Sequence, residues 1–246
     1  MSASAQVAVV TGGGSGIGLA TATRLAEDGF VVAVLDMDGD AAKSAAGPDG
    51  LGLVANVGDP VAVGAAFETI LAEFGRVDVL VNNAGITGGP SATNCHSTPL
   101  EEWEMVMAVN VRGPYLCSSA VLPTMIEQGS GHIITVASVA GQIVFPNRCA
   151  YVASKGAALM FAKSLAVDYA RYGIRSNAIC PGMVYTPMTA WRLDQDEMRQ
   201  AMESKIPIGR VAQPEEIADV IALLASGRMA YMTGAALNID GGWTAI

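Results

Sequence analysis

Three side chains in the middle of the sequence have the types and spacing for acid–base chemistry on an oxygen atom: Ser138, Tyr151 and Lys155. Tyr151 and Lys155 are four residues apart in a helical pattern, so they share one helix face. A tyrosine with its ordinary pKa of about 10 is a poor base at neutral pH, but a nearby ammonium group stabilises the phenolate and lowers that pKa. The Ser138 hydroxyl can donate to a substrate oxygen that gains negative charge. This trio predicts proton transfer at an alcohol or ketone oxygen.

A glycine-rich stretch near the N-terminus predicts a nucleotide site. It runs from Thr11 to Gly18, follows an apolar segment expected to be a strand, and opens an expected helix. Glycines there permit a tight turn, and the N–H groups at the start of a helix favour a pyrophosphate. The cofactor contacts that we expect in this stretch are Gly12, Ser15, Gly16, Ile17 and Gly18.

An acidic residue at the end of the next apolar segment bears on which cofactor is bound. Asp36 lies about 20 residues after the glycine-rich stretch, where a carboxylate accepts hydrogen bonds from the adenosine ribose hydroxyls. The same charge would repel a 2′-phosphate, and the stretch contains no lysine or arginine to offset it. NAD is therefore favoured over NADP. The alternative is that Asp36 merely caps a turn with Asp38 and Asp40.

Two later turns are expected at the same edge of the sheet. Asn56 and Val57 follow the third expected strand, where the Asn56 amide can bond an adenine edge. Asn83, Ala84 and Gly85 follow the fourth, with small residues and an amide side chain where ligands bind in such sheets. Taken alone, the second segment would more often be an ordinary turn.

The elements that must position these residues alternate between strand and helix. Short apolar runs without alternation indicate strands buried on both faces, as in a parallel sheet; they span Gln6–Val10, Val31–Leu35, Leu51–Ala55, Val77–Val81, His132–Val136, Ile174–Ile179 and Ala236–Ile239. Helical patterns lie between them, at Gly16–Asp28, Pro60–Gly75, Pro99–Gln128, Ala150–Tyr172 and Pro214–Ala225. This order predicts a doubly wound α/β fold of the Rossmann type. No linker or repeat divides the chain, so residues 1–246 are expected to form a single dinucleotide-binding catalytic domain.

Two segments depart from that pattern. Gly113-Pro114 interrupts the long helical stretch and predicts a break near Asn110–Pro114, where Asn110 could anchor a water that links Lys155 to solvent. Residues 184–208 combine Met, Trp and charged side chains without a core periodicity. We expect them to form a lid over the substrate.

Composition excludes several other classes of protein. The net charge of −9 argues against a nucleic-acid or anionic-membrane partner. The four cysteines have no CxxC spacing and no nearby histidine pair, so neither a disulfide framework nor a metal site is expected. No apolar run reaches the length of about 20 residues that spans a bilayer. The expectation is a soluble cytoplasmic enzyme acting on a small molecule.

The full set of motifs resembles the short-chain dehydrogenase/reductase family over essentially the whole chain. The resemblance is carried by Thr11–Gly18, Asn82–Gly85, Asn110, Ser138, Tyr151 with Lys155, and Pro181-Gly182 followed by Thr186. It implies a Rossmann-type sheet of about seven strands, Tyr151 as the acid/base and Lys155 as a ligand of the nicotinamide ribose. It also implies cofactor contacts at Pro181, Gly182, Val184 and Thr186, and a homotetramer or dimer, of which we expect the homotetramer. Asn56 departs from the aspartate of many members.

A narrower resemblance concerns the substrate. Phe145–Arg148, Thr186–Gln195 and the closing Thr244–Ile246 are similar to the members acting on 2-hydroxypropyl-coenzyme M, nearest to the R-specific kind. There, arginines matching Arg148 and Arg192 hold the substrate sulfonate; two guanidinium groups can clamp an oxyanion. The substrate residues that we expect are Ser138, Arg148, Tyr151, Trp191 and Arg192. Equally, Arg148 could pair with a carboxylate between subunits, and Arg192 could be a solvated lid residue.

Three functions therefore compete at this stage. The first is an NAD-dependent dehydrogenase of a secondary alcohol, with an anionic tail on the substrate as a refinement. The second is a reductase of 3-oxoacyl thioesters, which usually takes NADPH and is disfavoured by Asp36. The third is a non-catalytic nucleotide sensor on the same fold, whose mark would be the loss of Tyr151 or Lys155; both are present.

Overall fold

The computed structural model describes residues 5–89 and 93–246, and its centre is one seven-stranded parallel sheet. The strand order is β3-β2-β1-β4-β5-β6-β7, and every neighbouring pair is parallel. The strands are β1 Val7–Thr11, β2 Val31–Asp36, β3 Leu51–Val54, β4 Val79–Asn82, β5 Gly131–Val136, β6 Ile174–Pro181 and β7 Ala236–Ile239. The predicted fold class is confirmed, and the strand positions differ from the expected ones by at most two residues at an end.

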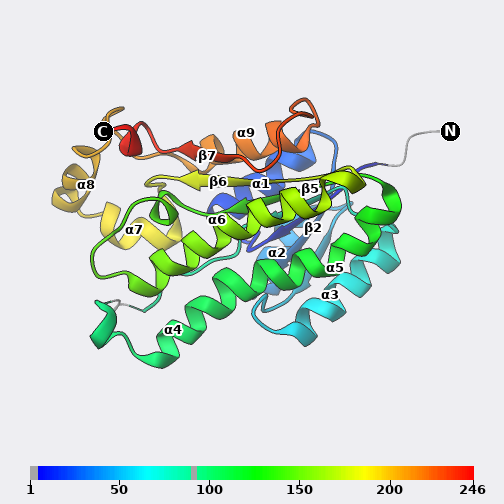
Figure 1. Ribbon diagram of the computed structural model, residues 1–246, viewed down its shortest axis with the longest axis horizontal. Coiled ribbons are helices and arrows are strands. Elements are labelled where there is room, and N and C mark those ends of the chain that lie inside the picture. The colour runs from blue at the N-terminus through cyan, green and yellow to red at the C-terminus, as the bar shows by residue number, and fades with distance from the viewer. Residues whose placement is uncertain (1–4, 90–92) are drawn as a thin grey trace.

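Helices cover both faces of this sheet (Figure 1). On one face, α1, α2 and α9 pack against side chains such as Val10, Val34 and Ile134; on the other, α3, α5 and α6 pack against Val9, Leu35 and Ile133. Residues in alternate positions along each strand therefore enter opposite cores, which explains the unbroken apolar runs. The helices are α1 Gly16–Glu27, α2 Gly39–Ala46, α3 Pro60–Phe74, α4 Leu100–Met107, α5 Gly113–Gln128, α6 Cys149–Tyr169, α7 Pro187–Leu193, α8 Asp196–Glu203 and α9 Pro214–Ala225.

The strand order reverses at β1, which lies between β2 and β4. Helices that follow strands on either side of this point leave in opposite directions, and a crevice opens at the carboxyl ends of the strands. The glycine-rich stretch follows β1, Asp36 ends β2 and Asn83 follows β4. The sheet topology therefore brings three of the expected cofactor segments to one crevice.

The expected break in the long helical stretch is wrong. A five-residue π-helical turn, Ala108–Arg112, connects α4 to α5 without interrupting the helical path, and Pro114 takes one of the first two positions of α5. Proline is tolerated there because the first turn of a helix has N–H groups with no intrahelical partner. The wider turn accommodates the Gly113-Pro114 pair and turns Asn110 inward, where only 2% of its surface is exposed.

The segment expected to be a lid contains the short helices α7 and α8, and its inner side is apolar. Leu193, Ile206 and Val211 form a small core of their own, completed by Met183, Tyr185 and Trp243. Trp243 begins a last helical turn, Trp243–Ala245, at the end of the chain. Figure 1 shows α7, α8 and the C-terminus together at one end of the molecule, opposite the N-terminus.

None of the helices in residues 5–89 and 93–246 has the length and hydropathy needed to cross a lipid bilayer.

Candidate active site

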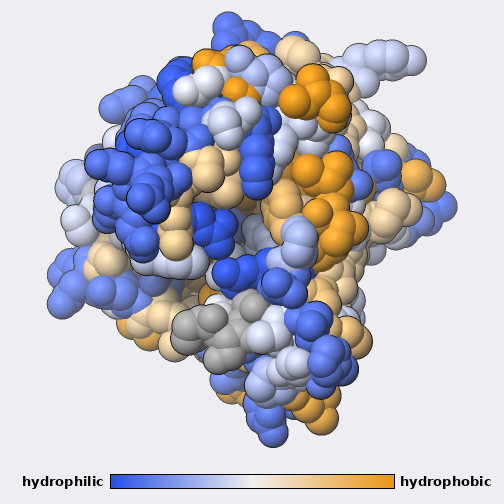
Figure 2. Space-filling model, turned by 90° about the vertical axis from the view of Figure 1, so that its left-hand side faces the viewer, coloured by the Kyte–Doolittle hydropathy of each residue, from blue (hydrophilic) through white to orange (hydrophobic). Residues whose placement is uncertain are grey.

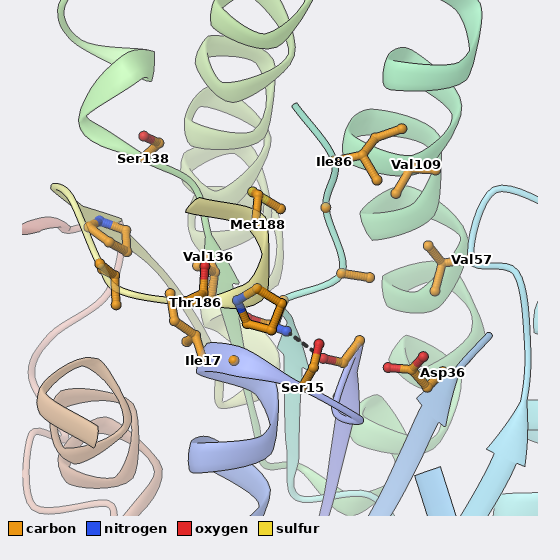
Figure 3. A pocket seen from close by; sticks show the side chains of 18 of the residues that line it. Ser15, Ile17, Asp36, Val57, Ile86, Val109, Val136, Ser138, Thr186 and Met188 are labelled. Atoms are coloured by element: carbon orange, nitrogen blue, oxygen red, sulfur yellow. Dashed lines mark hydrogen bonds between the residues drawn. The ribbon is translucent and has the colours of Figure 1, made fainter. Parts of the chain in front are cut away.

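A cavity of about 380 Å³ lies at the carboxyl ends of the strands. Figure 3 shows its length: Asp36 and Val57 lie at one end, Ser138 at the other, and Ser15 between them. The expected residues that line it are Gly12, Ser15, Gly16, Ile17, Asp36, Asn56, Val57, Asn83, Ala84, Gly85, Ser138, Tyr151, Lys155, Pro181, Gly182, Val184 and Thr186. Segments far apart in sequence thus form one continuous wall.

The glycine-rich turn is shaped for close approach of a ligand to the backbone. Gly12 has a φ of +62°, and a Cβ added there would lie 2.8 Å from Ala84 Cα. Gly16, with a φ of +52°, begins α1, so the N-terminal N–H groups of that helix face the cavity end of the turn. Gly18 does not line the cavity: a Cβ there would collide with the Gly12 carbonyl and Asn83. The glycine permits close packing of α1 on the turn, and the expected cofactor contact of Gly18 stays a prediction.

Asn83 fastens this turn to the neighbouring strand. Its amide nitrogen donates to the carbonyls of Thr11 and Gly12 at 2.9 and 3.0 Å. In return, the Thr11 hydroxyl accepts from the backbone N–H groups of Asn83 and Ala84 at 3.0 and 3.1 Å. The Asn83 side chain is therefore engaged by protein atoms, and its contribution is to hold two walls of the cavity together.

The Asp36 carboxylate faces the far end of the cavity. One oxygen accepts from the Gly14 N–H at 2.8 Å and the other from the Asp38 N–H at 3.1 Å. The capping alternative is thus partly right, although Asp38, rather than Asp36, caps α2. Among the described residues, Lys155 is the only lysine or arginine that lines the cavity, and it lies near Ser138 rather than near Asp36. Asn56 lines the same end, with its side-chain oxygen bonded to the Gly58 N–H at 2.9 Å.

Ser138, Tyr151 and Lys155 meet at the opposite end. Ser138 follows β5 and its hydroxyl accepts from the Ala140 N–H at 3.0 Å. Tyr151 lies in the first turn of α6 and Lys155 one turn later, so both face the cavity. The Lys155 ammonium donates to the Val136 carbonyl at 2.9 Å and lies 5.7 Å from the centre of the Tyr151 ring. The trio expected from the sequence is therefore assembled in space.

Burial dominates the acid–base properties of this pair. It raises the pKa of Tyr151, while the neighbouring Ser138 hydroxyl and the positive charge of Arg148 act in the opposite direction. It lowers the pKa of Lys155 to about 8. The expectation that Lys155 draws the Tyr151 pKa downward is therefore not met in this structure, because desolvation of the phenolate outweighs its neighbours. Lys155 itself can exchange a proton close to neutral pH.

Asn110 does not line the cavity but supports its wall. Its side chain accepts from the Ile86 N–H at 2.9 Å and donates to the Ile86 carbonyl at 2.8 Å and to the Ser154 hydroxyl at 2.9 Å. Ser154 in turn donates to the Tyr151 carbonyl at 2.7 Å. These bonds tie the loop after β4 to the first turns of α6. The role of Asn110 in anchoring a water stays a prediction.

The start of the lid segment touches the glycine-rich turn. A Cβ on Gly16 would lie 3.3 Å from Thr186 Cβ. Thr186 is the N-cap residue of α7, where it forms a reciprocal cap with Thr189. Met188, which is 41% exposed, also lines the cavity. The start of α7 therefore forms part of the cavity wall beside the glycine-rich turn.

Arg148 and Arg192 lie close enough to sense each other's charge. Burial lowers the pKa of Arg192, and the positive charge of Arg148 lowers it further. The Arg192 guanidinium stacks on the Trp191 ring, 4.9 Å from its centre. Within the part of the chain that the structure describes, neither arginine forms an ion pair with a carboxylate. Neither they nor Trp191 line the cavity itself. Figure 2 shows a hollow on this side of the molecule, with hydrophobic residues along one margin and hydrophilic ones along the other.

Several lining residues were not expected from the sequence. Most are apolar, and neither their type nor their spacing separates them from core residues; they are Leu35, Met37, Ala55, Ile86, Val109, Val136, Ala137, Pro187, Met188 and Thr189. Met188 and Thr189 could have been found, because they lie in the expected lid. Among the described residues, no group of three or more His, Cys, Asp or Glu side chains could hold a metal ion.

Comparison with known proteins decides the family. Residues 12–244 match the family described as enoyl-(acyl carrier protein) reductase. The chain is 48% identical to 2-(R)-hydroxypropyl-CoM dehydrogenase of Xanthobacter autotrophicus, over 98% of this chain and 99% of that protein. This chain is a short-chain dehydrogenase/reductase. The family resemblance of the sequence motifs, including the likeness to the hydroxypropyl-CoM enzymes, is thereby confirmed.

Two further relatives of this short-chain dehydrogenase bear on its substrate and cofactor. It is 41% identical to cis-4-hydroxycyclohexanecarboxylate dehydrogenase of Sinomonas cyclohexanicum, over 98% of this chain and 97% of that protein. It also superposes on a crystal structure of 3-ketoacyl-(acyl-carrier-protein) reductase from Brucella melitensis complexed with NADH, with a TM-score of 0.89 and 34% identity over 97% of this chain and 98% of that one. The chain is thus an oxidoreductase of alcohols or ketones that uses a nicotinamide cofactor.

The cavity fits such a cofactor on its own geometry. The positive φ angles of Gly12 and Gly16, the start of α1 and the absence of room for a Cβ at Gly12 form a turn that a pyrophosphate can approach closely. When bound, the cofactor supplies or accepts the hydride. Asp36 and Asn56 would hold its adenosine half, while Lys155, Gly182 and Thr186 would hold the nicotinamide half.

Proposed function

We propose that this short-chain dehydrogenase uses NAD to interconvert a secondary alcohol with an anionic tail and the corresponding ketone. The observation that carries the proposal is the pair Arg148 and Arg192. Two guanidinium groups that repel each other, without a carboxylate partner among the described residues, favour an external anion. The names of two relatives point in the same direction, because a CoM thioether carries a sulfonate and a cyclohexanecarboxylate carries a carboxylate.

The position of the arginines favours binding of the substrate tail rather than of the reacting group. Arg148 immediately precedes α6, three residues before Tyr151, and Arg192 lies on α7. Because neither lines the main cavity, an anion held between them would lie outside it, with the carbinol carbon extending inward to Tyr151. Binding energy from such a remote contact orients the reacting centre.

Three side chains perform the proton chemistry in this proposal. In the oxidation, Tyr151 as phenolate would accept the hydroxyl proton, and in the reduction it would return the proton to the carbonyl oxygen. The bound cofactor would accept or supply the hydride. Ser138 donates a hydrogen bond to the substrate oxygen as its charge develops. Lys155 favours the phenolate when protonated, and its pKa of about 8 allows it to pass the proton onward.

Asp36 supports NAD as the cofactor. Its carboxylate lies at the end of β2 facing the cavity, and no lysine or arginine lines that end in the described chain. A 2′-phosphate there would meet an uncompensated negative charge. Both oxygens already accept a backbone N–H, which fixes the orientation of the carboxylate but leaves lone pairs for ribose hydroxyls.

A 3-oxoacyl thioester reductase is the second candidate. The family match and the 3-ketoacyl reductase among the structural neighbours favour it. That neighbour holds NADH, so a preference for NAD would not by itself exclude this activity. A pantetheine thioester is long and carries its charge far from the carbonyl, whereas the two arginines lie within a few residues of the catalytic segments. A non-catalytic sensor is disfavoured because Tyr151, Lys155 and Ser138 share one cavity.

We further propose that the enzyme is a homotetramer. Met160 and Val167 are 61% and 80% exposed and lie seven residues apart on one face of α6. Tyr115 of α5, 55% exposed, makes an edge contact with Phe161 beside them. An apolar face of this kind on two adjacent helices is suited to pack against the same face of a second copy.

The substrate proposal is tested with purified enzyme by following NADH absorbance. The panel contains 2-hydroxypropyl-CoM in both configurations, a neutral thioether alcohol of the same length and a 3-oxoacyl thioester, each with NAD(H) and NADP(H). We expect the sulfonated alcohol with NAD to give the highest kcat/KM. A higher value for the neutral alcohol would contradict the anionic tail, and a higher value for the thioester would favour the second candidate.

A further inference from the structure

Trp243 is in contact with both segments that carry the two arginines. It lies near the end of the chain, in the turn Trp243–Ala245, and it is only partly exposed. Its ring stacks on Phe145, with the ring centres 5.2 Å apart and the planes inclined by 28°. It also completes the small core of Leu193, Ile206 and Val211. One side chain thus bridges Phe145 and a core whose first member, Leu193, lies 48 residues further along the sequence.

The first of these contacts fixes the loop that ends at Arg148. Phe145 lies three residues before Arg148, and Asn147 between them has a φ of +58°, an unusual value for a residue other than glycine. At the start of this loop, Gln142 exchanges two amide hydrogen bonds with Asn238 of β7, at 2.8 and 3.0 Å. The loop is therefore held at its beginning by Asn238 and near its end by Trp243.

The second contact involves the small core that holds the end of α7. Leu193, the last residue of α7, is fully buried in this core, on which Trp243 packs, and it follows Arg192 directly. The far end of the lid segment is held as well: the Ile208 N–H donates to the Gly241 carbonyl at 3.1 Å, and Cβ atoms on Gly241 or Gly242 would press on Ile206 or Pro207. The lid segment thus packs directly on the turn that presents Trp243.

That turn is rigid by its own hydrogen bonds. Asp240 accepts from the Gly242 N–H at 2.9 Å with one oxygen, and from the Thr244 N–H and hydroxyl at 2.9 and 2.6 Å with the other. Asn238 donates to the Thr244 hydroxyl at 2.8 Å. Residues 238–244 therefore form a fixed support at the end of the edge strand β7, and this support carries the Trp243 ring.

We propose that Trp243 is a positioning residue that sets the separation of Arg148 and Arg192, and so makes the enzyme selective for the tail of its substrate. The inference rests on the proposed function, because it assigns a cause to the geometry of the anion site. Trp243 is not among the residues that line the cavity with the catalytic trio. Without its ring, the Arg148 loop and the core at the end of α7 would lose their shared contact, and the guanidinium groups would separate under their mutual repulsion.

The test compares an anionic and a neutral substrate in matched variants. Trp243→Ala should raise KM for a sulfonated secondary alcohol about tenfold with kcat nearly unchanged, while kcat/KM for a neutral secondary alcohol such as 2-butanol and the affinity for NADH stay the same. Trp243→Phe, which keeps a ring that can stack on Phe145, should restore most of the KM. Ile246→Ala, at a side chain that is 89% exposed next to the same turn, is the control and should behave as the wild type.

A double-mutant cycle assigns the effect to the arginines. If Trp243 acts through them, Trp243→Ala should cause no further loss in a variant that already lacks both guanidinium groups. Two results would overturn the positioning role without contradicting the anion site. One is an equal loss of kcat/KM for anionic and neutral substrates in Trp243→Ala. The other is an undiminished loss of kcat/KM when Trp243→Ala is added to the arginine substitutions. If the arginine substitutions themselves do not discriminate between the two substrates, the proposed anion site fails and the role of Trp243 fails with it.

Discussion

At the scale of single residues, the candidate site places the phenol of Tyr151 beside the amine of Lys155. Tyr151 and Lys155 are both shifted toward their neutral forms by burial. A neutral phenol is the form required to protonate a ketone, and a phenolate is required to take a proton from an alcohol. We therefore expect charged and hydrogen-bonding groups of the bound cofactor and substrate to shift the pKa of Tyr151 further, so that each step has the protonation form that it requires.

The first prediction concerns Tyr151. Tyr151→Phe removes the transferable proton but leaves the ring in place, so kcat should fall at least about a hundredfold, while NADH affinity, measured by fluorescence titration, changes little. Tyr231→Phe, at a fully exposed tyrosine, is the matched control. Retention of more than about a tenth of the wild-type kcat would exclude Tyr151 as the acid/base.

The second prediction concerns Asp36. Replacing it with alanine and changing Met37, which is exposed beside it in the cavity wall, to arginine removes a negative charge and adds a phosphate partner. The ratio of kcat/KM for NADP to that for NAD should rise by at least about tenfold. Asp38→Asn, which preserves the cap of α2, should leave the ratio unchanged. A wild-type enzyme that already prefers NADP would refute the assignment.

Residue types and order were sufficient to predict most of the polar residues and glycines that line the cavity, because these stand directly after a strand or in the first turns of a helix. They were not sufficient for the partners of Asn110. Ile86 and Ser154 are 24 and 44 residues away and meet Asn110 only after the sheet and α6 have assembled. Gly18 shows a related limit, since a glycine that lines the cavity and one that packs beside it look alike in sequence.

At the scale of elements, a buried histidine links β5 to β6 and α9. His132 of β5 donates through Nδ1 to the Leu224 carbonyl at 3.1 Å and accepts through Nε2 from the Asn177 amide at 2.9 Å. Burial, together with the charge of Arg175, lowers its pKa to about 3. His132 is therefore neutral in the folded protein throughout the physiological range, far from the cofactor cavity.

This arrangement predicts how stability depends on pH. The pKa of His132 is lower in the folded protein than its unfolded value of about 6.5. Between these two pKa values the unfolded chain binds a proton at this residue and the folded chain does not. Stability from this residue is present above pH 6.5 and is lost as the pH falls toward 3, by about 1.4 kcal/mol per pH unit. The free energy of unfolding is measured by denaturant titration at several pH values in this range. Its loss per pH unit should be smaller in His132→Gln than in the wild type by that amount. His96→Gln, at the other, exposed histidine, should keep the wild-type slope; equal slopes for His132→Gln and the wild type would contradict the account.

The π-helical turn Ala108–Arg112 shows why element boundaries were harder to predict than element types. The sequence signals a disturbance at Gly113-Pro114, but a break and a wide turn have the same local signature. The outcome depends on contacts from elsewhere: the Asn110 side chain bonds to Ile86 and Ser154, and the Arg112 guanidinium donates to the Gly58 carbonyl at 2.9 Å. The short helix α2 was missed because its alanine-rich sequence has no wide apolar stripe.

At the scale of the whole molecule, the fold followed from its apolar runs because all seven strands are parallel and the five inner ones, β1, β2, β4, β5 and β6, are largely buried. The surface at which copies of the chain would associate could not be predicted from the sequence, because apolar residues on the outside of α5 and α6 resemble core residues there. Their exposure in the structure, with Val167 at 80%, is the observation on which the proposed interface rests.

A prediction follows for this face. Glutamate at both Met160 and Val167 would bury like charges across a two-fold interface, so sedimentation velocity should show dimers or monomers in place of tetramers. Val61→Glu, at an equally exposed apolar side chain on α3, should sediment as the wild type. If the double glutamate variant sediments as a tetramer, α6 does not form the interface.

The central claim, an anion site formed by two arginines, is tested most directly by kcat/KM for a sulfonated and a neutral secondary alcohol in Arg148→Ala and Arg192→Ala. Each variant should lose about 1.5–3 kcal/mol of transition-state stabilisation with the sulfonated alcohol, the strength of a charge-assisted hydrogen bond. It should lose almost none with 2-butanol, which is too short to reach either guanidinium. Arg171→Ala, at an exposed arginine stacked on Tyr172, controls for the loss of a positive charge. Equal losses with both alcohols would show that the arginines are structural and would contradict the account.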